Sequence, residues 1–227
     1  MFQTARDWNP KQAKLKEIIL KPECFIQAKQ LCLEMHSIVH SREVSNREKG
    51  SFFDEIWQDL SRTAVVTMPT VKDVTIAWNI WHITRIEDIV SNILIGDSEQ
   101  ILDDIWLKRL NTEIRDTANA MTDEEIIAFS ESVDMDQLRN YRNAVGKRTA
   151  EVIEGLSFAD MKRKAAARNL ERILTEGGVT EHKDSIWLLD FWSRKNIAGL
   201  MLMPITRHQV HHLNNCMKLK TKIMGRI

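Results

Sequence analysis

Cysteine, proline and glycine are scarce in this chain of 227 residues, which contains 3 Cys, 4 Pro and 8 Gly. Cys24, Cys32 and Cys216 are odd in number and show no C-x-x-C spacing. The sequence therefore predicts neither a disulfide framework nor a zinc knuckle. Because residues that break helices and strands are also few, long stretches are free to form regular structure.

An excess of charge of one sign is lacking, and so are long apolar runs. Lys plus Arg and Asp plus Glu each number 32, so no net field attracts DNA, RNA or an anionic membrane, and we expect no nucleic-acid partner. No stretch reaches the roughly 18 uncharged apolar residues of a membrane-spanning helix, and the first ten residues contain no apolar leader segment. These absences predict a cytoplasmic protein with no membrane partner.

Helical periodicity, in contrast, recurs from one end of the chain to the other. Apolar residues return every three or four positions, and strand-like alternation is scarce. With 43% hydrophobic residues, the chain can form one domain over residues 1–227. We predict an all-α fold whose long helices cover Pro22–Ser41, Val71–Ile95, Met135–Glu154 and Pro204–Ile223. Shorter helices are expected over Phe52–Arg62, Ser98–Leu110, Asp123–Ser130, Phe158–Thr175 and Ser185–Gly199.

Local signals mark several helix ends. A proline such as Pro22 or Pro204 suits a first helical turn, where its missing N–H costs nothing. Gly177-Gly178 is the clearest break between helices. A capping box, in which two side chains satisfy free amides of the first turn, is expected at Thr70 with Asp73, Thr122 with Glu125, and Ser157 with Asp160.

Three histidines lie in the apolar stripes of two predicted helices. His82 is central in the stripe formed by Val71, Val74, Trp78, His82, Ile86, Ile89 and Ile93. His208 and His212 are spaced i and i+4 on the last helix, so their side chains point the same way. A buried ring without partners loses hydrogen bonds worth about 1–3 kcal/mol, and three such rings need a common reason. If the two stripes face each other, three neutral imidazoles can hold one divalent ion and leave a position open, as catalytic zinc sites do.

The residues alone leave a second interpretation open, in which these histidines belong to a core hydrogen-bond network. The pair His36 and His40 has the same i, i+4 spacing, on a face offset from the apolar stripe of its helix. His211 flanks the His208–His212 face instead of sharing it. Spacing by itself therefore does not select one pair as metal ligands.

Two local strings resemble motifs of the DinB-like family of metal-dependent enzymes. Ala77–Asp88 reads AWNIWHITRIED and is similar to the family's second-helix motif, and Met203–Asn214 reads MPITRHQVHHLN and is similar to its last-helix motif. Similarity extends to Tyr141–Thr149 and Trp187–Trp192, and the resemblance spans most of Pro22–Lys222.

This resemblance implies an up-down-down-up four-helix bundle with additional short helices. It also implies a pocket at one end of the bundle, where His82, His208 and His212 bind zinc, nickel or a similar divalent ion. Characterised relatives in the resembling family include enzymes that use bacillithiol, mycothiol or glutathione, beside members with no known activity.

The ligand set narrows the expected chemistry. Three neutral nitrogen ligands do not neutralise the two positive charges of the ion. The ion therefore lowers the pKa of a bound water or thiol to about 7 or below. In an H-E-x-x-H zinc site the Glu is the general base, whereas here Gln209 follows His208. No carboxylate shares the His208–His212 face, which favours a substrate that brings its own acidic proton, such as a small thiol, to react with an electrophile. We expect thiol-dependent S-transfer or related transfer chemistry, with no catalytic residue assigned.

Two other functions stay open at this point. One is a metal-dependent hydrolase. The other is a non-catalytic helical protein, with or without a metal, whose 7 Trp and 10 Met form a surface for a partner or for a homodimer. The sequence gives no role to His36, His40, His211 or Cys216. Arg85 and Asp88 have the i, i+3 spacing of an ion pair and are expected to anchor their helix.

Overall fold

The computed structural model describes residues 1–45, 50–71 and 73–225, and these ranges contain helices but no β-strand. A single β-bridge joins Lys164 to Asn196. The predicted all-α fold is thus confirmed. No described helix is long and apolar enough to cross a membrane. The predicted helix Val71–Ile95 includes Lys72, which lies outside the described residues.

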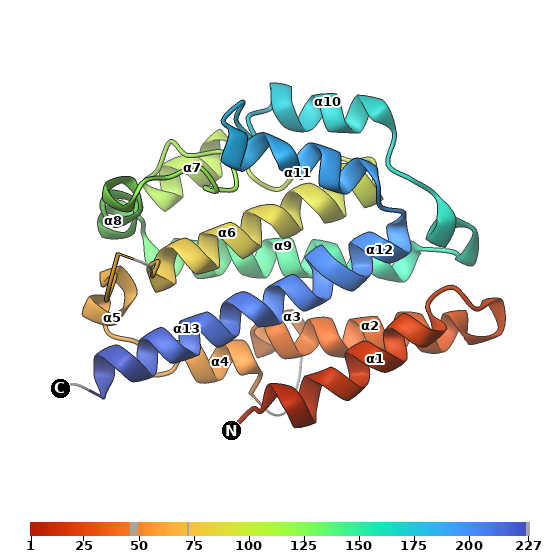
Figure 1. The fold of residues 1–227 in the computed structure, drawn as a ribbon, viewed down its shortest axis with the longest axis horizontal. Helices are drawn as coiled ribbons and strands as arrows, with labels where there is room; N and C mark the ends of the chain where they lie inside the picture. The colour runs from red at the N-terminus through yellow and green to blue at the C-terminus, as the bar shows by residue number, and fades with distance from the viewer. Residues whose placement is uncertain (46–49, 72, 226–227) are drawn as a thin grey trace.

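Four long helices form the centre of the molecule (Figure 1). They are α2 (Phe25–Val39), α6 (Ile76–Asp88), α9 (Met135–Gly155) and α13 (His208–Met224). Helix α6 packs against both α9 and α13, and α9 also packs against α2. Every residue of α6 except Trp78 is buried. A helix covered on all sides in this way must satisfy its polar side chains within the protein.

The long helices agree with the predicted ranges except at one start. Helix α2 follows a 3-10 turn, η2 (Pro22–Cys24), and α13 follows a π-helical turn, η5 (Met203–Arg207). Helix α6 continues into a second π-helical turn, η3 (Ile89–Ile95). The start predicted at residue 71 is wrong, because α6 begins at residue 76.

The side chain of Thr75 explains this later start. Its Oγ1 accepts a hydrogen bond from the Trp78 amide at 3.0 Å, which makes Thr75 the N-cap of α6. The expected capping pair Thr70 and Asp73 does form, with Thr70 Oγ1 donating to Asp73 Oδ2 at 2.8 Å, but it closes a turn instead of a helix. Val71 is 82% exposed, so the apolar stripe drawn from the sequence extends too far toward the N-terminus.

Shorter helices cover one side of this centre and extend its ends (Figure 1). They are α4 (Phe52–Trp57), α5 (Arg62–Val66), α7 (Asp104–Leu110), α8 (Asp123–Ser132), η4 (Phe158–Lys162), α10 (Ala167–Thr175), α11 (Lys183–Ser193) and α12 (Ile197–Leu202). Three segments predicted as single helices are each divided in two. In two of them a capping side chain inside the predicted range starts the new helix, Ser61 for α5 and Asn196 for α12, whereas α10 begins after Ala166 without a side-chain cap.

Three N-terminal elements were not predicted. They are η1 (Thr4–Trp8), α1 (Asn9–Ile18) and α3 (Arg42–Ser45). Helix α1 packs against α2 and α12. Only Leu15 and Ile18 are buried within α1, so its apolar periodicity is too sparse to identify the helix from sequence.

Other local predictions are confirmed. Capping boxes form at Thr122 with Glu125 and at Ser157 with Asp160. Gly177, at φ 75°, follows α10 with the left-handed backbone that glycine tolerates best.

The expected ion pair between Arg85 and Asp88 joins Nη1 to Oδ2 at 2.9 Å, and both side chains are fully buried. Asp88 also accepts hydrogen bonds from the amides of Ile101 and Leu102. The pair therefore fixes the chain that follows η3 against α6, in agreement with the anchoring role predicted from its spacing.

Candidate metal centre

Three histidine rings meet where α6 crosses the start of α13. His82 lies in the middle of α6 and is 4% exposed, while His208 and His212 are partly buried one turn apart on α13. His82 Nε2 and His208 Nε2 are 3.2 Å apart. The ring centroids of the three residues are separated by 5.0, 4.7 and 4.5 Å. One nitrogen from each ring lies within 4.8 Å of the other two, which is close enough for all three to reach a single ion.

The backbone before His208 contributes to this placement. The π-helical turn η5 widens the chain just before α13 begins, and its Pro204 has no N–H to satisfy in the first turn. Such single π-turns recur next to functional sites, because they change the direction in which the following side chains point.

Two of the rings are oriented by acceptors on α6 and on the loop before α8. Thr117 O lies 2.7 Å from His82 Nδ1, and Asn79 Oδ1 lies 2.8 Å from His212 Nδ1. A carbonyl oxygen can only accept, so both Nδ1 atoms carry the proton and both Nε2 atoms keep a lone pair, that of His82 facing His208 Nε2. Asn79 is itself held, since its Nδ2 donates to Thr75 O at 2.8 Å. This is the arrangement in which protein partners fix a metal-binding histidine.

His208 differs from the other two histidines. Its Nδ1 is buried and has no hydrogen-bond partner within the described part of the chain. Its ring is therefore placed by the position of α13 and by the contact of its Nε2 with His82 Nε2, and no protein acceptor holds its Nδ1.

A three-residue strap, Asp116–Ala118, holds the aromatic residues around His82. Its successive carbonyl oxygens accept from Trp81 Nε1 at 3.0 Å, from His82 Nδ1 and from Trp78 Nε1 at 3.0 Å. The Trp78 ring stacks on His82, with centroids 4.6 Å apart and planes 8° apart. Sequence reasoning missed the strap because a backbone carbonyl leaves no residue signature.

The surroundings keep the three rings neutral. Burial lowers the pKa of His82 to about 4, against a smaller opposite effect of its hydrogen bond to Thr117. Burial, and then the neighbouring His82 and His211, lower the pKa of His212 to about 2. The pKa of His208 is likewise well below its usual value, first through burial. Unprotonated imidazoles are the form that coordinates a metal.

The residues of this chain match a known family over most of this region. Residues 51–215 fit the sequence profile of the DinB superfamily. The chain belongs to the DinB superfamily. The matched segment includes all three histidines of the cluster. A search of curated proteins gives no match to the chain.

Other residues singled out in the sequence of this DinB-superfamily protein lie outside the cluster. His211 is exposed, with its ring 5.4 Å from that of His212. Cys216 is fully buried, and burial raises the pKa of its thiol to about 12, so it stays protonated near neutral pH. Neither residue belongs to the group whose atoms converge.

Gln209, which replaces the Glu of an H-E-x-x-H site, does not face the three rings as a base would. It is fully buried, and its Oε1 accepts from Arg142 Nη2 at 2.9 Å. Its Nε2 donates to Ile83 O at 3.1 Å. Within the described residues, no carboxylate forms a hydrogen bond with His82, His208 or His212.

A second group of potential ligands lies between α2 and α6 of the DinB-superfamily fold. His36 Nε2 is 2.9 Å from Glu87 Oε1, and His40 Nε2 is 2.9 Å from Glu87 Oε2. These three side chains are 2%, 0% and 0% exposed. Their donor atoms also lie within 4.8 Å of one another. Because His36 and His40 precede residue 51, they lie outside the segment that matches the superfamily.

The second group differs from the three-histidine cluster because it contains a charged carboxylate. Burial alone raises the pKa of the Glu87 carboxyl, but the charges and hydrogen bonds of His40 and His36 outweigh it and lower that pKa well below its usual value. Burial lowers the pKa of His40 to about 3. The group is thus an ionised carboxylate that accepts hydrogen bonds from His36 and His40, with Arg142 Nη1 4.0 Å from Glu87 Oε2.

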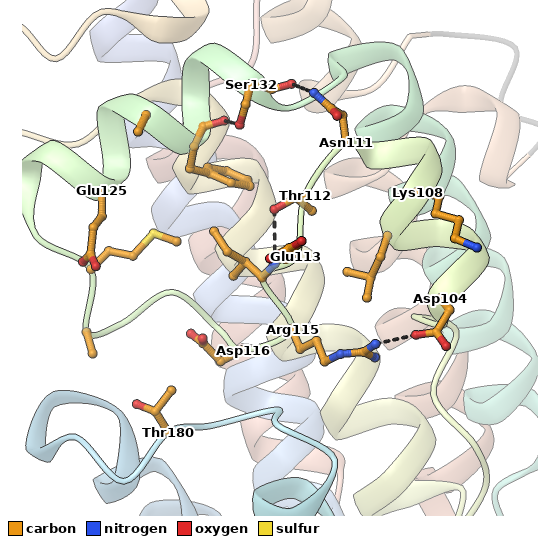
Figure 2. Close-up of a pocket in the computed structure, with 16 residues that line it drawn as sticks. Asp104, Lys108, Asn111, Thr112, Glu113, Arg115, Asp116, Glu125, Ser132 and Thr180 are labelled. Carbon is orange, nitrogen blue, oxygen red and sulfur yellow. Dashed lines mark hydrogen bonds and ion pairs between the residues drawn. The ribbon is translucent and has the colours of Figure 1, made fainter.

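A cleft of about 1270 Å³ is lined by none of the three histidines. It lies on the other side of the strap, where Asp116 lines it together with residues of α7, α8 and the loop between them (Figure 2). Arg115 reaches toward Asp104 along one wall. The pocket implied by the family resemblance is therefore not this cleft.

Proposed function

We propose that this protein binds one divalent metal ion through His82, His208 and His212. The observation that carries the proposal is the orientation of the rings. Two of the three present Nε2 lone pairs to a common point, because their Nδ1 protons are taken by Thr117 O and Asn79 Oδ1. Zinc and nickel both suit imidazole ligands. The up-down-down-up order of the four long helices is part of the same proposal.

A metal held by three neutral imidazoles supplies Lewis acidity at a position left open for a further ligand. The chain's own residues orient the rings, keep them unprotonated and exclude water from the α6 side, where Trp78 stacks on His82. Among the described residues, no carboxylate forms a hydrogen bond with the three rings, so the site lacks the carboxylate base of an H-E-x-x-H site. A substrate with a proton that is more acidic than that of water suits such a site better than water does.

We therefore propose transfer chemistry in which a low-molecular-weight thiol reacts with an electrophile. Sulfur forms the new bond to the electrophilic carbon, the leaving group departs with its electron pair, and the thiol proton passes to solvent. Gln209 supports this choice over hydrolysis, since its amide is engaged with Arg142 and Ile83 O and offers no carboxylate.

The first experiment measures bound metal in protein purified without a histidine tag. We expect about one equivalent of ion per chain, and loss of that ion in the His208→Ala variant. The matched control is His211→Ala, which removes an exposed neighbouring imidazole and is expected to keep the ion. Equal metal content in all three proteins would contradict the ligand assignment.

The second experiment tests the reaction class. Metal-loaded protein is assayed with a panel of small thiols and 1-chloro-2,4-dinitrobenzene, beside ester and amide substrates. We expect a metal-dependent rate of thiol conjugation that disappears in His82→Ala. Hydrolysis of esters or amides without thiol conjugation would replace transfer with the hydrolase alternative, and no turnover of either kind would favour a non-catalytic metal protein.

A further inference from the structure

Gln209 connects the two helices that carry the candidate ligands. It follows His208 on α13, and its Nε2 donates to Ile83 O, the carbonyl of the residue that follows His82 on α6. The same Nε2 donates to Pro204 O at 3.3 Å, within the π-helical turn that precedes α13. One buried amide thus fixes the position of α13 along α6 at the level of the three rings.

Arg142 holds the other end of this amide. Its Nη2 donates to Gln209 Oε1 at 2.9 Å and to Val39 O, at the end of α2, at 3.0 Å. Its Nη1 donates to Thr84 Oγ1 at 3.2 Å. A guanidinium on α9 therefore joins α2, α6 and α13, and it is fully buried, so its charge needs a nearby anion.

Glu87 is the carboxylate nearest to that guanidinium, and this bears on whether the second histidine group holds an ion. The Glu87 carboxylate lies 4.0 Å from the Arg142 guanidinium, so the two opposite charges balance each other. A dication placed there would add two positive charges that nothing neutralises in a region closed to water. Closed zinc sites use four protein ligands, whereas this group offers three, all less than 3% exposed.

We propose that Gln209, held in place by Arg142, is a positioning residue that sets the geometry of the His82, His208 and His212 site, and that His36, His40 and Glu87 support Arg142 instead of holding an ion. The inference rests on the proposed metal site. His208 has no acceptor for its Nδ1, so its place relative to His82 depends on the packing of α13 that Gln209 controls.

Gln209→Glu tests the proposal with almost no change in side-chain size. The carboxylate can still accept from Arg142, but it has no N–H for the carbonyls of Ile83 and Pro204 and repels both. Asn169→Asp is the matched control, because Asn169 is also buried and its Nδ2 donates to a backbone carbonyl, Ile93 O, at 2.7 Å. Asn169 lies on α10, which carries none of the three histidines.

The measurements are the stoichiometry and affinity of added Co²⁺, the visible absorption spectrum of the bound Co²⁺, and urea unfolding. We expect wild-type protein to bind one Co²⁺ per chain. Gln209→Glu should bind it about tenfold more weakly, as changes behind metal ligands commonly do, with a shifted spectrum that reports altered coordination. Asn169→Asp should lose stability while keeping the wild-type affinity and spectrum.

Three results would overturn the inference. A Gln209→Glu variant with the affinity and spectrum of wild type would show that Gln209 positions nothing, while the proposed metal site would stand. Two Co²⁺ per wild-type chain, the second lost in His40→Ala, would make the second group a metal site. No bound Co²⁺ in wild type would remove the proposed function and this inference together. If Gln209→Glu does not fold, Arg142→Lys, which keeps the charge but not the planar set of donors, is expected to weaken Co²⁺ binding with the same spectral shift.

Discussion

The two histidine groups of this protein contain the same spacing in very different surroundings. His208 and His212 form an i, i+4 pair that faces a third imidazole, is partly buried and has no carboxylate attached. His36 and His40 form an i, i+4 pair that donates to a carboxylate in a closed interior. In the first group, imidazole lone pairs remain that can bind a metal ion. In the second group, the Nε2 atoms already form hydrogen bonds with Glu87. The comparison teaches that the group opposite an H-x-x-x-H pair, and not its spacing, determines what the pair can bind.

The largest expected contrast is in metal content. His208→Ala should weaken metal binding by at least about 100-fold, since two imidazoles remain where three are needed, and its far-ultraviolet circular dichroism should stay helical because the helices pack through many apolar contacts. His40→Ala should keep the ion and instead lower the free energy of unfolding by about 1–3 kcal/mol, because Glu87 loses a donor. If a helical His40→Ala variant lost its metal, both histidine groups would be required for metal binding and the contrast between them would fail.

The next contrast concerns charge. Glu87→Gln should lower the free energy of unfolding by about 3 kcal/mol, since it leaves the buried Arg142 without its counter-charge. Removing an exposed partner such as Glu151, which pairs with Arg148 at 3.4 Å, should cost about 0.5 kcal/mol or less. Urea unfolding of Glu87→Gln and Glu151→Gln measures both. Equal losses would show that Arg142 does not depend on Glu87.

A pH dependence is expected from His40. Its pKa is about 3 in the folded protein, against about 6.5 in the unfolded chain. Below pH 6.5 the unfolded chain takes up a proton that the folded protein does not, so the stabilisation is complete above that pH and decreases as the pH falls toward 3. Between pH 7 and 5 the loss should be about 2 kcal/mol.

Urea unfolding at these two pH values provides the measurement, with His40→Gln as the comparison. Wild type should lose about 2 kcal/mol more than the variant over this interval. Glu87 also loses its stabilising effect in acid, but in a lower window, below its unfolded pKa of about 4.3. Parallel pH profiles for wild type and His40→Gln would mean that folding does not lower the pKa of His40.

The smallest expected contrast is steric. A Cβ added at Gly146 would lie 2.5 Å from His40 Nδ1, so Gly146→Ala should cost about 1–2 kcal/mol by overpacking. Gly155→Ala, on the same helix, meets no atom within 4 Å and should be neutral or stabilise the helix. Thermal unfolding of the pair checks the difference. A stable Gly146→Ala protein would show that His40 can move away from α9.

Some features of the two histidine groups could be predicted from sequence and others could not. The three proposed ligands could be predicted because each lies in an apolar stripe, where an unpaired imidazole needs a partner, and because the strings around them resemble a family. Glu87 is not identified from sequence, since beside Arg85 and Asp88 it resembles one more charge on a helix. Only the structure shows that it is buried and that His36 and His40 donate to it.

Other features have no signature in the side-chain pattern. Thr117 orients His82 through a carbonyl oxygen that every residue type has, and Gln209 resembles a missing catalytic base until its partners are known. The start of α6 was placed too early because Val71 and Val74 continue the apolar period into a turn. In each case a tertiary contact decides the outcome, and local periodicity does not report it.

Helix α2 has a consequence for how the boundaries of this protein are understood. It lies before residue 51, where the match to the superfamily begins, yet it supplies His36 and the carbonyl that fixes Arg142, and His40 follows directly at its C-cap. A fragment cut at the limits of the match would retain every proposed metal ligand while losing these partners of Glu87 and Arg142. The match over residues 51–215 therefore does not delimit an autonomous folding unit, and any excised or grafted version of the site must carry residues 25–40 with it.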